Sequence, residues 1–198
     1  PRSVLESLRK PLEEHKIKIV REKGEYVFPA EFLLVAAMNP CPCGNYPDLE
    51  KCTCTTAQRS AYFGKLSQPF LERMDLCIDV PKMQYTHLTE ESEAEKSETI
   101  RERVMRARKI QESRFQELQM QTNAGMGMKE IERYCELSDE GQRLMRQAYE
   151  RLGLSARTYH KVLTVARTIA DLAGEKSISI QHLQEALGYR MIDANYGR

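Results

Sequence analysis

Proline is confined to the first part of this chain. All eight prolines occur at or before Pro81, although the chain continues to residue 198. Because proline interrupts helix interiors, the region up to Pro81 is expected to be rich in turns and the region after it to form long helices. Five of the six cysteines also precede this point. The sequence therefore predicts a change of architecture near Pro81.

The composition is that of a folded protein with an ordinary core. Apolar residues make up 41% of the 198 residues and charged residues 30%, enough for one or two domains. The formal net charge of +1 gives no sign of a chain-wide nucleic-acid-binding surface. The sequence has no apolar run of membrane-spanning length and no secretory signal, so we expect a cytoplasmic protein without a membrane partner. Because it begins with Pro1, we expect a part of a longer protein.

A helix and a β-hairpin are expected at the start of the chain. Residues 2–14 place apolar side chains at helical spacing, and Pro11 is expected to end or kink this helix. Residues 16–21 alternate polar and apolar side chains. A turn at residues 22–24 and a second extended stretch at residues 25–28 follow, which together predict a hairpin.

Two continuous apolar runs, residues 32–38 and 76–80, predict strands buried in an α/β sheet. Asn39 directly follows the first run. Ligands of open α/β sheets bind beyond the carboxyl ends of the strands, so Asn39 is a candidate site residue. The alternative is that Asn39 only forms the turn before Pro40.

Beyond Pro81 the chain is expected to form an all-α bundle. Residues 82–98 are polar and acidic, which favours an exposed linker. Arg167 is expected to pair with Asp171 one helical turn later. Ser138, Ser155 and Ser179 are typical helix N-cap residues, and Gly153 and Gly174 are typical of helix ends. Helical patterns cover residues 57–65 and 69–73 before Pro81, and 100–120, 128–136, 138–152, 155–173 and 179–190 after it. The predicted fold class is thus α/β followed by all-α.

Four cysteines form two Cys-x-Cys pairs on one turn-rich segment, at Cys41, Cys43, Cys52 and Cys54. Four thiolates can bind Zn²⁺ tetrahedrally, and a loop with little core gains folding energy from the metal. The pattern therefore predicts a structural zinc site that is closed to water. A reduced loop without metal and an iron–sulfur or redox site stay open as alternatives. The two remaining cysteines lie in apolar patterns and are expected at core positions.

Several blocks of this sequence resemble one known family. They read VLESLRKPLE at residues 4–13, FLLVAAMNPCPCG at 32–44, SQPFLERMD at 67–75, LSARTYH at 154–160 and ARTIADL at 166–172. In these blocks the chain resembles the magnesium-chelatase-like AAA+ ATPases of the ComM/YifB type, and Asn-Pro-Cys-Pro-Cys-Gly is the most specific string. The resemblance implies that residues 1–81 are the end of an AAA+ α/β nucleotide-binding core. It also implies that residues 99–198 form the helical lid, of the magnesium-chelatase C-terminal type.

Two motifs that such an ATPase needs do not occur in this sequence. It contains no Gly-x-x-x-x-Gly-Lys-Ser/Thr loop for phosphate and no apolar strand that ends in Asp-Glu for Mg²⁺. The resemblance places both upstream of the first predicted helix. We therefore expect the longer protein to use ATP and Mg²⁺, and this chain alone not to hydrolyse ATP.

The resemblance assigns roles to three polar residues. Asn39 matches sensor 1, an amide that orients the attacking water against the γ-phosphate. Arg73 matches the arginine finger, whose fixed fork reaches the nucleotide of a neighbouring subunit. Arg157 matches sensor 2, a lid residue that contacts nucleotide. Without the motif, Arg73 is simply a surface residue that pairs with Asp75 or Glu72.

Four cations lie on the predicted hairpin, at Lys16, Lys18, Arg21 and Lys23. In this branch of AAA+ ATPases a hairpin just before the sensor 1 strand can face the central pore. The resemblance therefore implies a contact between these cations and a nucleic-acid backbone. The alternative is that this face of the hairpin contacts only solvent, because two glutamates reduce its net positive charge.

The leading hypothesis is an ATP-driven motor. The resemblance implies that it self-associates into a ring, expected to be a hexamer, and remodels DNA as a helicase or branch-migration enzyme. One alternative is a zinc-stabilised helical adaptor that binds protein or nucleic acid without catalysis, since this chain contains no phosphate loop. A further alternative is a magnesium chelatase subunit. It ranks lower because the Cys-Pro-Cys segment belongs to the ComM-like branch.

Overall fold

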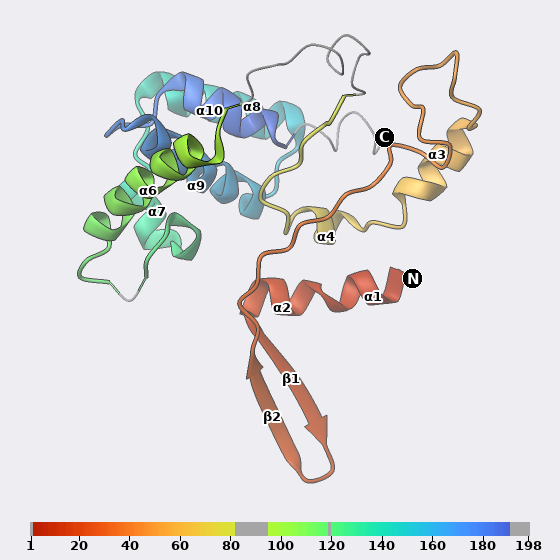
Figure 1. Ribbon diagram of the computed structural model, residues 1–198, viewed down its shortest axis with the longest axis horizontal. Helices are drawn as coiled ribbons and strands as arrows, with labels where there is room; N and C mark the ends of the chain where they lie inside the picture. Colours follow the sequence, from red (N-terminus) through yellow and green to blue (C-terminus); the bar gives the residue numbers. More distant parts are fainter. Residues whose placement is uncertain (1, 82–94, 119, 191–198) are drawn as a thin grey trace. The chain divides into compact units, whose positions relative to one another are not determined.

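The computed structural model describes residues 2–81, 95–118 and 120–190 of the chain (Figure 1). Most of the predicted linker and the last residues of the predicted lid lie outside these ranges. The described residues are mainly helical and carry one two-stranded sheet. They divide into two compact units between Asp75 and Leu76. None of the described helices combines the length and the apolar character that crossing a membrane requires.

The first unit consists of short helices and a β-hairpin: α1 (Arg2–Ser7), α2 (Arg9–Glu14), β1 (Lys16–Arg21), β2 (Gly24–Pro29), α3 (Thr56–Phe63) and α4 (Gln68–Leu71). The helix predicted over residues 2–14 is present but breaks at Leu8. Pro11 lacks the N–H that would bond to the carbonyl of Ser7, and its ring crowds that carbonyl, so the helix is interrupted there. The two short helices predicted before Pro81 are confirmed as α3 and α4.

The predicted hairpin is confirmed. β1 pairs antiparallel with β2 in a register that runs from Lys16 opposite Pro29 to Arg21 opposite Gly24. Gly24 adopts a φ of 144°, a conformation that favours glycine. Every residue of both strands is exposed, and Figure 1 shows the hairpin extending from the end of α2.

The two strands predicted for an α/β sheet are not formed, which corrects the sequence-based expectation. Residues 32–38 and 76–80 are irregular, and β1 and β2 are the strands of the sheet that the described residues form. Side chains of both runs are exposed to solvent, by 88% at Leu33 and 86% at Val80. A strand buried on both faces needs hydrogen-bonded neighbours along its edges. Within the described ranges neither run pairs with a strand, so a continuous apolar run was not sufficient to predict one here.

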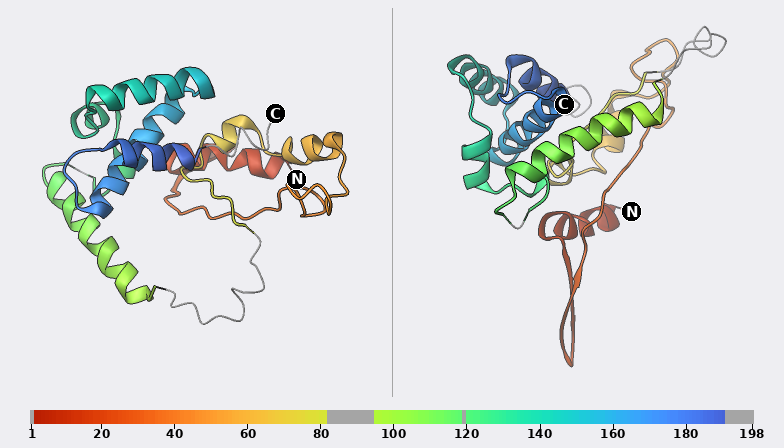
Figure 2. Two further views of the ribbon diagram at one scale, coloured as in Figure 1. Left: turned by 90° about the horizontal axis from the view of Figure 1, so that it is seen from above. Right: turned by 60° about the vertical axis from the view of Figure 1, so that its left-hand side comes forward.

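The second unit is helical, as predicted: α6 (Ser97–Arg114), η1 (Asn123–Gly125), α7 (Met128–Tyr134), α8 (Asp139–Leu152), α9 (Ala156–Ala173) and α10 (Ile180–Gly188). Helix α9 packs against α6, α7, η1 and α10, and α10 packs on α8. Figure 2 shows this group of helices from two further sides. Helix α6 ends earlier than predicted, because the chain turns at Phe115 and buries that ring edge-on against Tyr134.

Capping residues set the helix ends of this unit. The side chains of Ser138, Ser155 and Ser179 each accept the backbone N–H three residues later, which confirms all three predicted N-caps. Gly153 and Gly174 adopt left-handed φ values of 61° and 74° and end α8 and α9 as predicted.

A buried carboxylate joins three elements of the second unit. Asp171 on α9 is 1% exposed and accepts hydrogen bonds from Arg114 of α6 at 2.7 Å and from Asn123 of η1 at 2.8 Å. Arg167 donates to the same carboxylate at 3.2 Å, which confirms the predicted pair. Burial raises the pKa of Asp171, but the hydrogen bonds from Arg114 and Asn123 outweigh it and lower the pKa overall.

Replacing this carboxylate is expected to destabilise the helical unit strongly. Asp171→Asn removes the negative charge from two arginines, of which Arg167 is 2% exposed. A buried charge that loses its partner costs about 3–5 kcal/mol. Urea unfolding followed by circular dichroism at pH 7 measures the loss. Glu150→Gln breaks the exposed pair with Arg146 and serves as the control, expected to change stability by less than about 1 kcal/mol.

The lowered pKa of Asp171 makes the stability of the fold depend on pH. The ionised Asp171 stabilises the fold fully above the ordinary aspartate pKa of about 3.9, and this stabilisation is lost as pH falls through the lower folded pKa. The difference in stability between the native chain and Asp171→Asn should therefore shrink below about pH 4. A difference below about 1 kcal/mol at pH 7 would contradict the structural role given to this network.

Candidate functional site

The structure brings the four clustered cysteines together. The Sγ atoms of Cys41, Cys43, Cys52 and Cys54 all lie within 4.8 Å of one another. Cys41 is buried and its sulfur lies 3.3 Å from that of Cys43 and 3.8 Å from that of Cys52. Four sulfurs at the usual Zn–S distance of a tetrahedral site stand about 3.8 Å apart. The donor set and its spacing therefore fit zinc.

Local hydrogen bonds shape the loop that carries these sulfurs. The carbonyl of Cys41 accepts the N–H of Gly44 at 3.0 Å, and Gly44 has a left-handed φ of 76°. Further along, the carbonyl of Asp48 accepts the N–H of Cys52 at 2.8 Å, which closes the loop between the two cysteine pairs. The guanidinium of Arg59 stacks 4.7 Å above the ring of Tyr46. Turns and one stacked pair thus bring the sulfurs close without a large apolar core.

The thiols of this cluster differ in acidity. A hydrogen bond from the backbone of Asn45 is the main cause that lowers the pKa of Cys43 to about 5, so this sulfur is a thiolate at neutral pH. Burial raises the pKa of Cys54 to about 11. Because the thiolate is the form that binds metal, the lowered pKa makes Cys43 a ready ligand.

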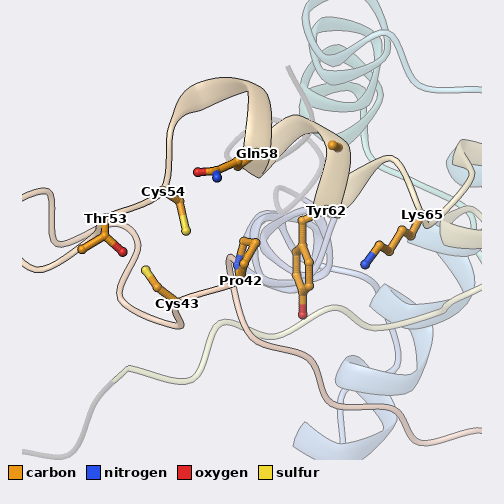
Figure 3. Close-up of a pocket in the computed structure, with 8 residues that line it drawn as sticks. Pro42, Cys43, Thr53, Cys54, Gln58, Tyr62 and Lys65 are labelled. Carbon is orange, nitrogen blue, oxygen red and sulfur yellow. The ribbon is translucent and has the colours of Figure 1, made fainter.

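A pocket of about 460 Å³ lies between the cysteine loop and α3. Figure 3 shows Cys43 and Cys54 at one side of it and Tyr62 and Lys65 at the other. None of the patterns identified in the sequence predicted this pocket. The spacing of Gln58, Tyr62 and Lys65 at helical intervals just after the cysteines was the available signal.

Asn39 lies exposed beside the cysteine loop. A Cβ atom on Gly44 would stand 3.6 Å from the Nδ2 atom of Asn39, so the two residues are close neighbours. The structure therefore links the proposed sensor 1 residue to the loop and leaves its side chain open to solvent.

Arg73 is tied to other elements of the first unit. Its side chain is only 10% exposed and forms an ion pair with Glu13 of α2. Its Nε atom also donates to the carbonyl of Arg9 at 3.2 Å, and another guanidinium nitrogen donates to the carbonyl of Pro69. These contacts join the turn after α4 to α2. They are different from the Asp75 and Glu72 contacts considered in the sequence analysis.

The remaining candidate cations are exposed. Arg157 lies in the first turn of α9, after the Ser155 cap. All four hairpin cations are exposed, and Lys18 forms an ion pair with Glu25 at 3.4 Å. Part of the positive charge on the hairpin is therefore neutralised across the strands.

Comparison with known proteins gives matches along nearly the whole chain. The sequence-family model for the magnesium chelatase subunit ChlI matches residues 1–88. The family model for the C-terminal region of the same subunit matches residues 94–190. The chain is 45% identical over 194 residues to the competence protein ComM of Haemophilus influenzae, covering 96% of this chain and 36% of that protein. It is 40% identical over 193 residues to the uncharacterized protein YifB of Escherichia coli, covering 97% and 37%.

The chain thus spans just over a third of the length of these curated relatives. The two matched regions follow one another in the order in which the sequence blocks occur. The two family matches are consecutive, and the relatives align with almost every residue of this chain. Both findings agree with the resemblance seen in the sequence blocks. The chain belongs to the magnesium-chelatase-like AAA+ family of the ComM/YifB type.

Proposed function

We propose that this chain is the C-terminal portion of an AAA+ ATPase that couples ATP hydrolysis to remodelling of DNA, as a helicase or branch-migration enzyme. The observation that carries the proposal is the alignment with the competence protein ComM over 96% of the chain. The family suggests the use of ATP and Mg²⁺. In this proposal the longer protein forms a ring of six copies in the cytoplasm. Its remaining residues supply the phosphate loop and the acidic strand end.

Residues 1–81 are proposed as the end of the nucleotide-binding core and residues 99–198 as the lid. The exposed apolar runs at 32–38 and 76–80 support this division. Such runs are normally covered in a folded protein, and a sheet completed by other residues of the longer protein would cover them.

Three residues of this chain are proposed to act on the nucleotide. The amide of Asn39 would orient the attacking water, and Arg157 would contact the phosphates from the lid. Arg73 would stabilise the charge on the transferred phosphoryl group in a neighbouring subunit. Bound Mg²⁺ would neutralise phosphate charge during the reaction. To reach a phosphate, the Arg73 guanidinium must exchange Glu13 for the phosphate oxygens, which present the same kind of acceptor.

Arg73→Ala in the full-length protein is expected to abolish rapid hydrolysis. The variant should still bind ATP and assemble, because an arginine finger contributes mainly to the transition state. The rate should fall by about 10³-fold or more in a steady-state phosphate-release assay. Arg73→Lys should not restore it, because an ammonium lacks the planar fork of a guanidinium.

Glu13→Gln is the matched control for Arg73. It breaks the same ion pair but keeps the guanidinium, so hydrolysis should stay within about twofold of the native rate. If Glu13→Gln and Arg73→Ala reduce the rate equally, Arg73 acts by holding α2 in place and is not a finger.

Cys41, Cys43, Cys52 and Cys54 are proposed to hold one structural zinc ion. Elemental analysis of metal-replete protein should find about one zinc per chain. Cys41→Ser should lower this content and the thermal stability of the first unit, because metal binding contributes folding energy. Cys77→Ser alters a half-buried cysteine outside the cluster and should retain the zinc. Zinc-free native protein would favour the reduced loop instead.

The hairpin cations are proposed to contact the DNA backbone. Changing Lys16, Lys18, Arg21 and Lys23 to alanine in the full-length protein should weaken DNA binding. It should also flatten the dependence of log affinity on log salt, because fewer counterions are released. Glu25→Gln frees Lys18 from its ion pair and should strengthen binding. Unchanged affinity and salt slope in the alanine variant would reject this contact.

A further inference from the structure

The pocket between the cysteine loop and α3 is not used by any role assigned above. Its volume of about 460 Å³ lies within the range of small-molecule sites, roughly 300–1,000 Å³. It is lined by Pro42, Cys43, Thr53, Cys54, Gln58, Ala61, Tyr62 and Lys65 (Figure 3). Both its walls belong to the first unit, so its shape does not depend on how the two units are arranged.

An aromatic ring and a cation form one wall of the pocket. Tyr62 projects from α3, and the Nζ atom of Lys65 lies over one face of the Tyr62 ring, 5.2 Å from its centroid. The ring is half-buried, and the face that Lys65 does not cover offers a stacking surface for a nucleobase. The neighbouring ammonium would lie close to the phosphate of a nucleotide stacked there.

Hydrogen-bonding groups line the pocket on both walls. The Oε1 atom of Gln58 accepts the N–H of Thr55 at 2.9 Å in a capping box, which orients the amide and leaves its Nε2 group as a donor. Across from α3, the hydroxyl of Thr53 offers an acceptor and the sulfurs of Cys43 and Cys54 offer weak ones. The pocket therefore combines a stacking surface with donors and acceptors that suit the edge of a base.

We propose that this pocket binds an unpaired base of a DNA single strand, stacked on Tyr62 with its backbone beside Lys65. The inference rests on the proposed DNA-remodelling function and adds a contact site apart from the hairpin. A base inside a duplex is stacked on both faces and cannot enter a pocket without being extruded. The pocket thus selects single strands, including the unpaired segments that remodelling exposes.

Tyr62→Leu in the full-length protein tests this site. Leucine keeps apolar bulk but has no ring, so affinity for a mixed-sequence DNA single strand should fall by about fivefold or more. Affinity for a duplex of the same sequence should stay within about twofold. Because stacking releases no counterions, the salt slope of single-strand binding should not change. Tyr62→Phe retains the ring and should bind like the native protein.

Two further variants separate stacking from charge and from folding. Lys65→Ala should reduce the salt slope by up to about one, as expected for one lost phosphate contact. Tyr189→Leu removes a ring of the second unit that does not line the pocket, so it should leave single-strand affinity unchanged. The zinc content of every variant, compared with the native protein, reports whether the cysteine loop is intact.

The outcomes distinguish this proposal from the broader one. If the native protein binds neither single-stranded nor duplex DNA, the proposed function fails and this site with it. If the native protein binds single strands and Tyr62→Leu binds them equally well, only the pocket proposal is wrong. If free mononucleotides compete as strongly as an oligonucleotide at equal base concentration, the pocket is a mononucleotide site and the single-strand assignment is overturned.

Discussion

The first unit buries very little of its own surface. Among its described residues, Cys41 and Phe70 are the buried apolar side chains. Since burial of apolar surface is the main source of folding energy, the unit depends on directional contacts. These are the cysteine cluster, the turns of its loop, the hairpin ladder and the Arg73 link to α2. Each of the residues proposed to act on nucleotide or DNA in this unit lies on one of these contacts or beside it.

The second unit is stabilised in a different way from the first. It has a continuous apolar core around α9 and α10, and within that core the ionised Asp171 accepts from three side chains. A buried carboxylate with all its partners in place strongly disfavours other arrangements of α6, η1 and α9, because each would leave a charge unpaired. The proposed lid residue Arg157 therefore projects from a helix whose position is tightly specified.

Local chemistry was predictable from the sequence and long-range pairing was not. The serine caps, the glycine helix ends, the hairpin and the cysteine cluster follow from residues a few positions apart, and the structure confirms them. The runs at 32–38 and 76–80 have the composition of buried strands, but a strand forms only beside a partner. The link from Arg73 to Glu13 spans 60 positions and has no local signature. The pocket at Tyr62 likewise depends on how the loop folds back on α3.

The cysteine loop and the pocket share residues, and the loop also leads directly into α3. Thr55, which caps α3, directly follows Cys54, so a metal bound at Cys54 would hold the N-cap of the helix that carries Tyr62. Cys43 and Cys54 belong both to the sulfur cluster and to the pocket wall. A four-cysteine zinc site is closed to water and has no catalytic position, so its contribution must be structural. A zinc ion bound there would fix the distance between the loop and the Tyr62 ring, and with it the width of the pocket.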